Sequence, residues 1–126
     1  MIFIIDDTPA DIELTTIALE ETGREMDVRS APDGKSALTL LRKGMKPSLI
    51  LLDLKMPGMS GIEVLRAIRA DNGLKDLPVV VFTSSSLESD RVEALAAGAS
   101  GYLEKSLSLQ QISENLTNVL LCYFPD

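Results

Sequence analysis

Three aspartates follow two short apolar runs of this sequence and have the chemistry for metal binding and phosphoryl transfer. Asp6 and Asp7 come directly after the run at residues 2–5, and Asp53 follows the run at residues 49–52. Crowded carboxylates repel one another unless a cation joins them, and Mg²⁺ suits carboxylate oxygens, waters and phosphate oxygens. A carboxylate can also attack phosphorus as a nucleophile. We therefore predict that the three aspartates bind Mg²⁺ and that Asp53 accepts a phosphoryl group.

Two further polar residues are expected at the same place. Thr83 ends the apolar run at residues 79–82, and Lys105 lies just past a weak apolar segment at residues 102–103. Phosphoryl transfer requires mainly placement and neutralisation of charge on the phosphoryl oxygens. A hydroxyl and an ammonium group can each contact one such oxygen. We predict that Thr83 and Lys105 act together with Asp53 as the catalytic residues.

Five strand-like segments alternate with five helical ones, which predicts how these residues are brought together. The expected strands are residues 2–5, 26–30, 49–52, 79–82 and 102–103. Continuous apolar runs in the first, third and fourth are typical of central parallel strands, whereas the alternating second and weak fifth suit the sheet edges. The prediction is an α/β, flavodoxin-like doubly wound (βα)5 fold with strand order 2-1-3-4-5, in which ligands bind beyond the carboxyl ends of the first and third strands.

The helix signals agree with this alternation. Thr8 is the expected N-cap of the first helix, with Pro9 at its first position. Capping boxes are expected at Ser60/Glu63, Ser85/Glu88 and Ser108/Gln111. The side chains expected to be buried, helix by helix, are Leu14, Ile17 and Ala18; Ala37, Leu38 and Leu41; Val64, Leu65 and Ile68; Val92, Leu95 and Ala96; and Leu109, Ile112, Leu116, Val119 and Leu120.

The composition is that of one globular domain spanning residues 1–126. Hydrophobic residues make up 45% and charged residues 25% of the chain. No apolar run approaches the roughly 20 residues of a membrane span, and the N-terminus lacks signal-peptide features, so we expect a cytoplasmic protein that makes no membrane contact. A net charge of −7 without a dense basic cluster argues against direct nucleic-acid binding.

Two residue counts narrow the chemistry further. The chain contains no histidine, which excludes the Ser/His/Asp and Cys/His catalytic groupings and the usual zinc enzymes. Any phosphohistidine that donates a phosphoryl group must therefore belong to another protein. The single cysteine, Cys122, excludes an internal disulfide, and we expect it to be a small core residue.

Over essentially its full length the chain resembles the receiver domain of bacterial two-component response regulators. The resemblance rests on an ordered set of motifs at the predicted strand ends. The set comprises Asp6 and Asp7, Asp53 with residues 55–61 (KMPGMSG), Thr83 and Ser84, Gly98 and Ala99, and Tyr102 with Lys105. Together these motifs are highly specific.

The resemblance implies a phosphoacceptor signalling domain that is not an enzyme in the usual sense, because it catalyses only its own phosphorylation and dephosphorylation. The donor would be a sensor histidine kinase or a histidine phosphotransfer protein. Mg²⁺ would be held by Asp7, Asp53 and the backbone carbonyl of Lys55, with Asp6 acting largely through water. Thr83 and Tyr102 would be the switch residues, and their movement would remodel the surface of the fourth helix, fifth strand and fifth helix.

That surface would bind an unknown downstream protein, and a homodimer is a further option. The chain would be either a stand-alone receiver, like the chemotaxis regulators, or an excised portion of a longer regulator. Two positions depart from the family pattern. Receivers commonly have a proline after the lysine, preceded by a cis peptide, where this chain has Ser106; a cis bond there would cost about 3 to 4 kcal/mol. Lys55 stands at a variable position, where we expect its charge to alter hydrolysis of the phosphoryl group.

Three other readings are open. A magnesium-dependent phosphohydrolase of the haloacid dehalogenase type also uses an aspartyl nucleophile, but places a second acid where this chain has Lys55. A flavodoxin-like mononucleotide binder is disfavoured by acids at the end of the first strand, which would repel a ligand phosphate. A receiver-like scaffold that no longer accepts phosphate is not supported by the complete set of site residues.

Overall fold

Five parallel strands form one sheet in the computed structural model, which describes residues 1–105 and 108–124. The strands are β1 (Ile2–Ile5), β2 (Val28–Ala31), β3 (Leu49–Leu52), β4 (Val79–Thr83) and β5 (Gly101–Glu104). The helices are α1 (Pro9–Glu21), α2 (Gly34–Arg42), α3 (Gly61–Ala70), α4 (Glu88–Ala96) and α5 (Leu109–Tyr123). The sheet order is β2-β1-β3-β4-β5, so the predicted doubly wound fold is confirmed.

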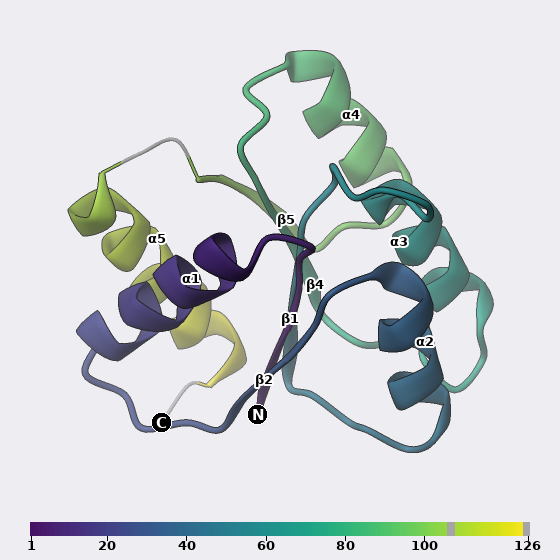
Figure 1. Cartoon of the computed structure of the whole chain (residues 1–126), viewed down its shortest axis with the longest axis horizontal. Helices are drawn as coiled ribbons and strands as arrows, with labels where there is room; N and C mark the ends of the chain where they lie inside the picture. Colours follow the sequence, from purple (N-terminus) through teal and green to yellow (C-terminus); the bar gives the residue numbers. More distant parts are fainter. Residues whose placement is uncertain (106–107, 125–126) are drawn as a thin grey trace.

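Helices cover both faces of the sheet. Helices α1 and α5 lie side by side on one face, and α2, α3 and α4 lie on the other (Figure 1). Alternate residues of β1 point to opposite sides: Ile2 and Ile4 pack in the cluster under α1 and α5, whereas Phe3 and Ile5 pack in the cluster under α2 and α3. Two apolar layers therefore hold the sheet from both sides.

Burial along the strands explains the sheet order. Every residue of β1, β3 and β4 is buried, as continuous apolar runs predict for central strands. At the edges, β5 is half-buried throughout and β2 buries only Ala31. The second strand occupies Val28–Ala31 rather than the predicted 26–30, because its pairing with β1 runs from Ile2↔Val28 to Ile5↔Ala31.

Two of the three predicted capping boxes are confirmed. Both reciprocal bonds form at Ser60/Glu63, which begins α3, and at Ser108/Gln111, which begins α5. The predicted box at Ser85/Glu88 is wrong, because α4 begins at Glu88 with Leu87 as its N-cap residue.

Ser85 and Thr8 use their polar groups differently from what the capping predictions assumed. The Ser85 hydroxyl donates to Asp90 Oδ2 at 2.6 Å and accepts from the Leu87 N–H at 3.3 Å. Thr8 is the N-cap residue of α1, with Pro9 in the first turn, but its side chain makes no cap hydrogen bond.

The buried faces of α1 and α4 differ from the predicted ones. In α1 the buried residues are Thr15, Ala18 and Leu19, whereas Ile17 is 38% exposed. Burial of Thr15 is possible because its hydroxyl donates to the carbonyl of Asp11 at 2.8 Å.

Helix α4 buries only Ala94, so the prediction that Val92, Leu95 and Ala96 face the core is wrong. Val92 is 56% and Leu95 40% exposed. This helix lies over the edge strand β5, and its one small buried residue packs against Val81 of β4. Two larger apolar side chains are therefore left on the surface.

The last helix buries Ile112, Leu116 and Leu120, but the prediction was wrong for two other residues. Leu109, the first residue of α5, is 40% exposed. Cys122 is exposed rather than a core residue. It follows Leu120 by two positions, a rotation of about 200° around the helix axis that turns it away from the core.

Arg69 of α3 connects two loops near the amino ends of β4 and β5. Its guanidinium donates to the backbone carbonyls of Gly98 at 2.9 Å, Lys75 at 3.0 Å and Leu77 at 2.7 Å, and to the Ser100 hydroxyl at 3.4 Å. Burial lowers the pKa of Arg69. Gly98 has a φ of +107°, and a Cβ atom there would lie 3.0 Å from Arg69 Cγ. The close approach and the backbone conformation both favour glycine.

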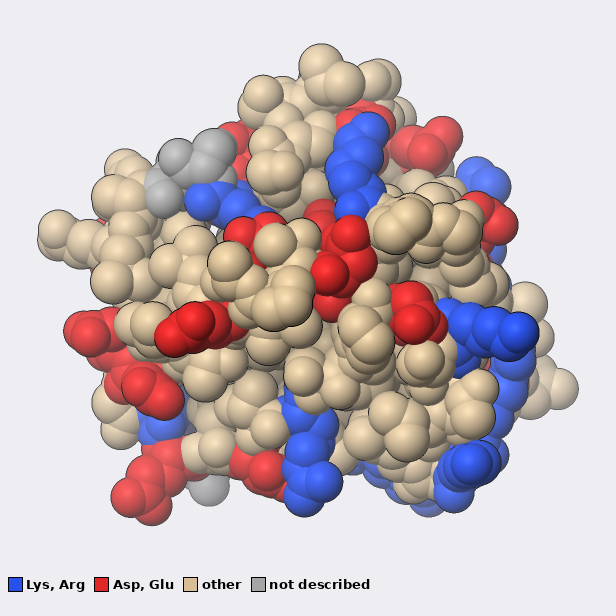
Figure 2. Space-filling view, in the orientation of Figure 1, with Lys and Arg blue, Asp and Glu red and all other residues tan. Residues whose placement is uncertain are grey.

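On the face seen in Figure 2, acidic and basic side chains are most numerous in different regions. Acidic atoms lie over the α1 side and near the middle of the view, and basic atoms lie over the α2 side (Figure 2). The stretch from residue 34 to residue 52 contains four basic residues and no acidic one. Among the residues that the structure describes, no helix combines the length and apolar character needed to cross a membrane.

Candidate functional site

The strand register places the predicted acids side by side. Strand β1 pairs with β3 so that Ile5 lies beside Leu52, and the Asp53 N–H donates to the Ile5 carbonyl at 3.0 Å. Asp6 and Asp53 therefore leave adjacent strands at the same edge. Strand β4 follows on the other side of β3, and the Lys105 N–H donates to the Thr83 carbonyl at 2.8 Å. All the predicted strand-end residues thus lie at the carboxyl edge of the sheet.

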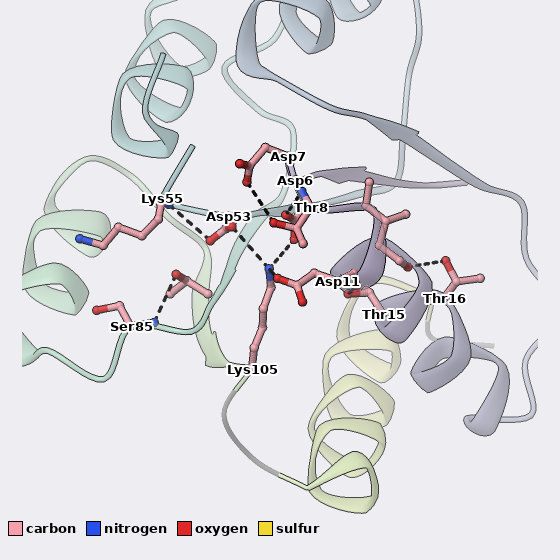
Figure 3. A network of polar contacts seen from close by, with 12 residues as sticks. Asp6, Asp7, Thr8, Asp11, Thr15, Thr16, Asp53, Lys55, Ser85 and Lys105 are labelled. Atoms are coloured by element: carbon pink, nitrogen blue, oxygen red, sulfur yellow. Dashed lines mark hydrogen bonds and ion pairs between the residues drawn. The ribbon is translucent and has the colours of Figure 1, made fainter. Parts of the chain in front are cut away.

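The three aspartates among the predicted metal ligands converge. Each of Asp6, Asp7 and Asp53 offers a carboxylate oxygen, and these oxygens lie within 4.8 Å of one another. Asp6 and Asp53 are buried, with 2% and 7% of their surface exposed, and Asp7 is half-buried. Figure 3 shows the three side chains grouped at the ends of β1 and β3. Residues far apart in the sequence therefore form one acidic cluster.

Lys105 reaches into this cluster. Its ammonium donates to Asp6 Oδ2, lies 3.5 Å from Asp53 Oδ2 and 3.2 Å from Asp11 Oδ2, and its side chain is 6% exposed (Figure 3). The ammonium also lies 5.8 Å from the centre of the Phe82 ring, within range of a cation–π contact.

The site contains more negative than positive charge. Burial by itself lowers the pKa of Lys105, but the Asp6 hydrogen bond and the charges of Asp53, Asp6 and Asp11 outweigh it and leave that pKa above its ordinary value. Burial raises the pKa of Asp6 and outweighs the opposing effects of Lys105 and of the Thr8 N–H. Among the described residues the site holds four carboxylates and one ammonium, which contacts three of them, so a divalent cation with a preference for oxygen ligands fits the acidic cluster.

Close packing of α3 fixes the backbone around Asp53. The Gly61 N–H donates to the Leu54 carbonyl at 3.0 Å. A Cβ atom on Gly61 would lie 2.2 Å from the Asp53 carbonyl oxygen, so the first helical residue must lack a side chain for α3 to start here. The KMPGMSG segment thus returns the chain against the end of β3.

Thr83 and Tyr102 are both linked to Ser85, in the connection after β4. Thr83 is fully buried, and its hydroxyl accepts from the Ser85 N–H at 3.4 Å. The Tyr102 hydroxyl donates to the Ser85 carbonyl at 3.2 Å. Burial raises the pKa of Tyr102. The two predicted switch residues therefore share one partner, which the sequence had suggested only as a helix cap.

The Lys55 side chain does not join the acidic cluster. Its backbone N–H donates to Asp53 Oδ1 at 3.4 Å, but its ammonium lies 3.4 Å from Asp90 Oδ2 of α4. Figure 3 shows the Lys55 side chain extending away from Asp53. The Ser85 hydrogen bond, followed by the charge of Lys55, lowers the pKa of Asp90.

Asp11 is a site residue that sequence reasoning missed. It lies in the first turn of α1, and its carboxylate contacts the Lys105 ammonium. The available signal was the Thr8-x-x-Asp11 pattern, which has the form of a capping box and so suggests a local role. The sequence also raised the question of a cis peptide bond between Lys105 and Ser106, but Ser106 lies outside the described residues.

The family profile described as "Response regulator receiver domain" matches residues 2–117 of this chain. The DNA-binding response regulator MtrA of Mycolicibacterium smegmatis is 39% identical over 111 residues, covering 88% of this chain and 46% of MtrA. The chain thus spans about half the length of this relative. The chemotaxis protein CheY of Pseudomonas aeruginosa is 36% identical over 118 residues, which cover 94% of each protein.

Solved structures give the same family. The phosphorylated cyanobacterial phytochrome response regulator RcpA superposes with a TM-score of 0.87 at 33% identity, covering 98% of this chain and 92% of RcpA. The Mn²⁺-bound form of response regulator Rcp1 superposes with a TM-score of 0.78 at 30% identity, covering 95% of this chain and 91% of Rcp1. A divalent ion in one neighbour agrees with the acidic cluster found here.

Proposed function

The chain belongs to the family of response regulator receiver domains, and on that premise we propose that Asp53 accepts a phosphoryl group from a phosphohistidine of a partner protein. The observation that carries this role is the convergence of Asp6, Asp7 and Asp53 with the Lys105 ammonium among them. The donor is a sensor histidine kinase or a histidine phosphotransfer protein, since this chain has no histidine of its own.

The proposed cofactor is Mg²⁺, held by Asp6, Asp7, Asp53 and the backbone carbonyl of Lys55. When bound, the ion supplies positive charge beside the phosphoryl oxygens. The residues named as ligands offer only oxygen atoms, as this ion prefers. Asp6 is proposed to act largely through water, in keeping with its direct hydrogen bond to Lys105.

The transfer step uses the side chains at the carboxyl edge of the sheet. An Asp53 carboxylate oxygen bonds to phosphorus while the phosphorus–nitrogen bond of the phosphohistidine breaks and its electron pair returns to the imidazole. The Lys105 ammonium and the Thr83 hydroxyl contact phosphoryl oxygens. Water later releases phosphate from Asp53, so the domain catalyses only its own phosphorylation and dephosphorylation.

The proposed output surface consists of α4, β5 and α5. Thr83 and Tyr102 both hydrogen-bond to Ser85, so a shift of Thr83 toward a phosphoryl group would move Ser85 and thereby alter the hydrogen bond of Tyr102. Helix α4 exposes Val92 and Leu95, which suit a protein partner better than a nucleic acid. A homodimer through the same surface is a second form of the same contact.

We treat residues 1–126 as a single receiver domain, because the family profile covers residues 2–117 and one sheet joins both apolar layers. The magnesium phosphohydrolase is not favoured. Enzymes of that type carry an acid where this chain has Lys55, whose ammonium pairs with Asp90.

Mass spectrometry after incubation with acetyl phosphate and Mg²⁺ tests the proposal. We expect one added phosphoryl unit on the parent protein and none on Asp53→Asn, which keeps the shape of the side chain but removes the nucleophile. Omission of Mg²⁺ should also prevent the addition. An unchanged mass in the parent, or equal labelling of Asp53→Asn, would contradict the assignment.

A further inference from the structure

We propose that Asp11 is a positioning residue that orients the Lys105 ammonium for phosphoryl transfer, an inference that rests on the proposed function of Asp53. Asp11 belongs to α1, whereas Lys105 follows β5, so their contact joins segments 94 residues apart. The distance of 3.2 Å between Asp11 Oδ2 and Lys105 Nζ lies within the range of a hydrogen bond between oppositely charged groups.

At the start of α1, Asp11 contacts Lys105 and does not form the local capping box that its spacing from Thr8 would allow. The Thr8-x-x-Asp11 pattern could form a capping box, in which the acid would accept from the Thr8 N–H. The pairs at the starts of α3 and α5, where the Ser is the N-cap residue as Thr8 is in α1, form complete boxes. At Thr8 the N–H instead donates to Asp6 Oδ1 at 3.0 Å, and the Thr8 side chain makes no cap bond. The Asp11 carboxylate is thereby available to Lys105.

Asp11 differs from Asp6 and Asp53, the other partners of Lys105, because it has no proposed role in binding the cation or the phosphoryl group. Asp6 and Asp53 belong to the three-acid cluster that fits a cation, and Asp53 is the proposed phosphoacceptor. Once those carboxylates take other partners, they hold Lys105 less firmly. Asp11 is not part of the cluster found among the described residues, so it can keep its contact with the ammonium throughout the transfer.

This contact matters because a lysine side chain has four rotatable bonds. Asp6 and Asp53 approach the ammonium from the sheet, and Asp11 approaches it from α1 (Figure 3). Ion pairs from two elements restrict the ammonium to one region beside Asp53. Removal of the Asp11 charge should therefore slow phosphoryl transfer without removing a metal ligand.

The test compares Asp11→Asn with Asp11→Glu and with Glu13→Gln as a matched charge control, since Glu13 is an exposed acid on the same helix. Phosphorylation is followed over a range of acetyl phosphate concentrations at saturating Mg²⁺, and Mg²⁺ binding is measured by calorimetry. We expect the maximal rate of Asp11→Asn to fall by roughly tenfold with little change in KM. Mg²⁺ affinity should not weaken, Asp11→Glu should recover part of the rate, and Glu13→Gln should match the parent.

A second readout does not depend on phosphorylation. The side-chain NMR signals of Lys105, assigned by their absence in Lys105→Arg, should shift and broaden in Asp11→Asn but not in Glu13→Gln. If the parent accepts no phosphoryl group, the proposed function of Asp53 fails, while the Lys105 signals still show whether Asp11 orients the ammonium. An unchanged maximal rate or unchanged Lys105 signals in Asp11→Asn would overturn the positioning role, as would a weakened Mg²⁺ affinity.

Discussion

Two cations at opposite ends of the sheet are held in contrasting ways. Lys105 lies at the carboxyl edge among the carboxylates of Asp6, Asp11 and Asp53. Arg69 lies near the amino ends of β4 and β5, where it binds mainly backbone carbonyls of two loops. Both cations join segments distant in the sequence, but only one set of partners consists of charged side chains.

The pKa values of Arg69 and Lys105 are shifted in opposite directions, and the partners of each cation explain why. Burial lowers the pKa of Arg69, because the neutral carbonyl dipoles around it do not fully replace water. Burial also acts against the charge on Lys105, but its hydrogen bond to Asp6 and the surrounding carboxylates reverse the outcome and raise that pKa. Carboxylates can exchange one cation for another, whereas backbone carbonyls cannot leave without moving their loops. We therefore expect Lys105 to serve the reaction and Arg69 to serve stability.

The largest expected effect comes from Lys105→Met, which removes the ammonium while keeping an unbranched apolar stem. The initial rate of phosphorylation by acetyl phosphate should fall about 10²-fold, the scale associated with losing one preorganised charge contact to a transition state. Mass spectrometry at fixed times measures the rate, and circular dichroism checks that the variant is folded. A rate within twofold of the parent would show that the Lys105 ammonium does not serve the transfer reaction.

Arg69→Met should give the opposite pattern. Loss of hydrogen bonds to the carbonyls of Gly98, Lys75 and Leu77 should lower the free energy of unfolding by about 2 kcal/mol. The phosphorylation rate per folded molecule should stay at the parental value. Urea denaturation measures the stability, and Arg66→Met is the control, because Arg66 is an exposed cation on the same helix. Equal stability of the two variants would show that the loop contacts of Arg69 contribute little.

The arrangement of acids could be predicted because it depends on the strands alone. Continuous apolar runs identified β1 and β3 as central neighbours, and residues that directly follow adjacent parallel strands must lie side by side. Neither step needed knowledge of how the helices pack. The same reasoning placed Thr83 and Lys105 at the carboxyl edge, and the structure confirms their positions there.

The predictions from sequence were wrong at residues whose local pattern suggests one partner but whose actual partner depends on the tertiary structure. Ser85 resembled a helix cap, but its hydroxyl bonds to Asp90. Asp11 had the spacing of a capping acid, but it contacts Lys105 across 94 residues of sequence. The apolar residues of α4 have helical spacing, yet only Ala94 is buried because this helix lies over an edge strand. Each outcome depends on tertiary contacts that a local pattern does not contain.

Lys55 is a third cation whose environment lies between those of Lys105 and Arg69, and its substitution has the smallest expected effect. Its ammonium pairs with one carboxylate, Asp90, and the two side chains are 64% and 22% exposed. Such a pair contributes little to stability, so neither Lys55→Ala nor Asp90→Asn should change the melting temperature appreciably through this contact. The structure holds the positive charge away from Asp53, but the Lys55 backbone N–H contacts the Asp53 carboxylate.

We expect Lys55→Ala to change the rate of dephosphorylation by a few-fold, because it removes the positive charge from the residue two positions after the proposed phosphoacceptor Asp53. Asp90→Asn should change that rate in the opposite direction, because it releases the Lys55 ammonium to approach Asp53. Loss of radiolabelled phosphate from the purified phosphoprotein measures both rates, with Glu93→Gln as the control for removing an exposed acid from α4. Equal rates in the parent and Lys55→Ala would refute an influence of this cation on hydrolysis. Changes of the same sign in Lys55→Ala and Asp90→Asn would show instead that the ion pair acts as a unit.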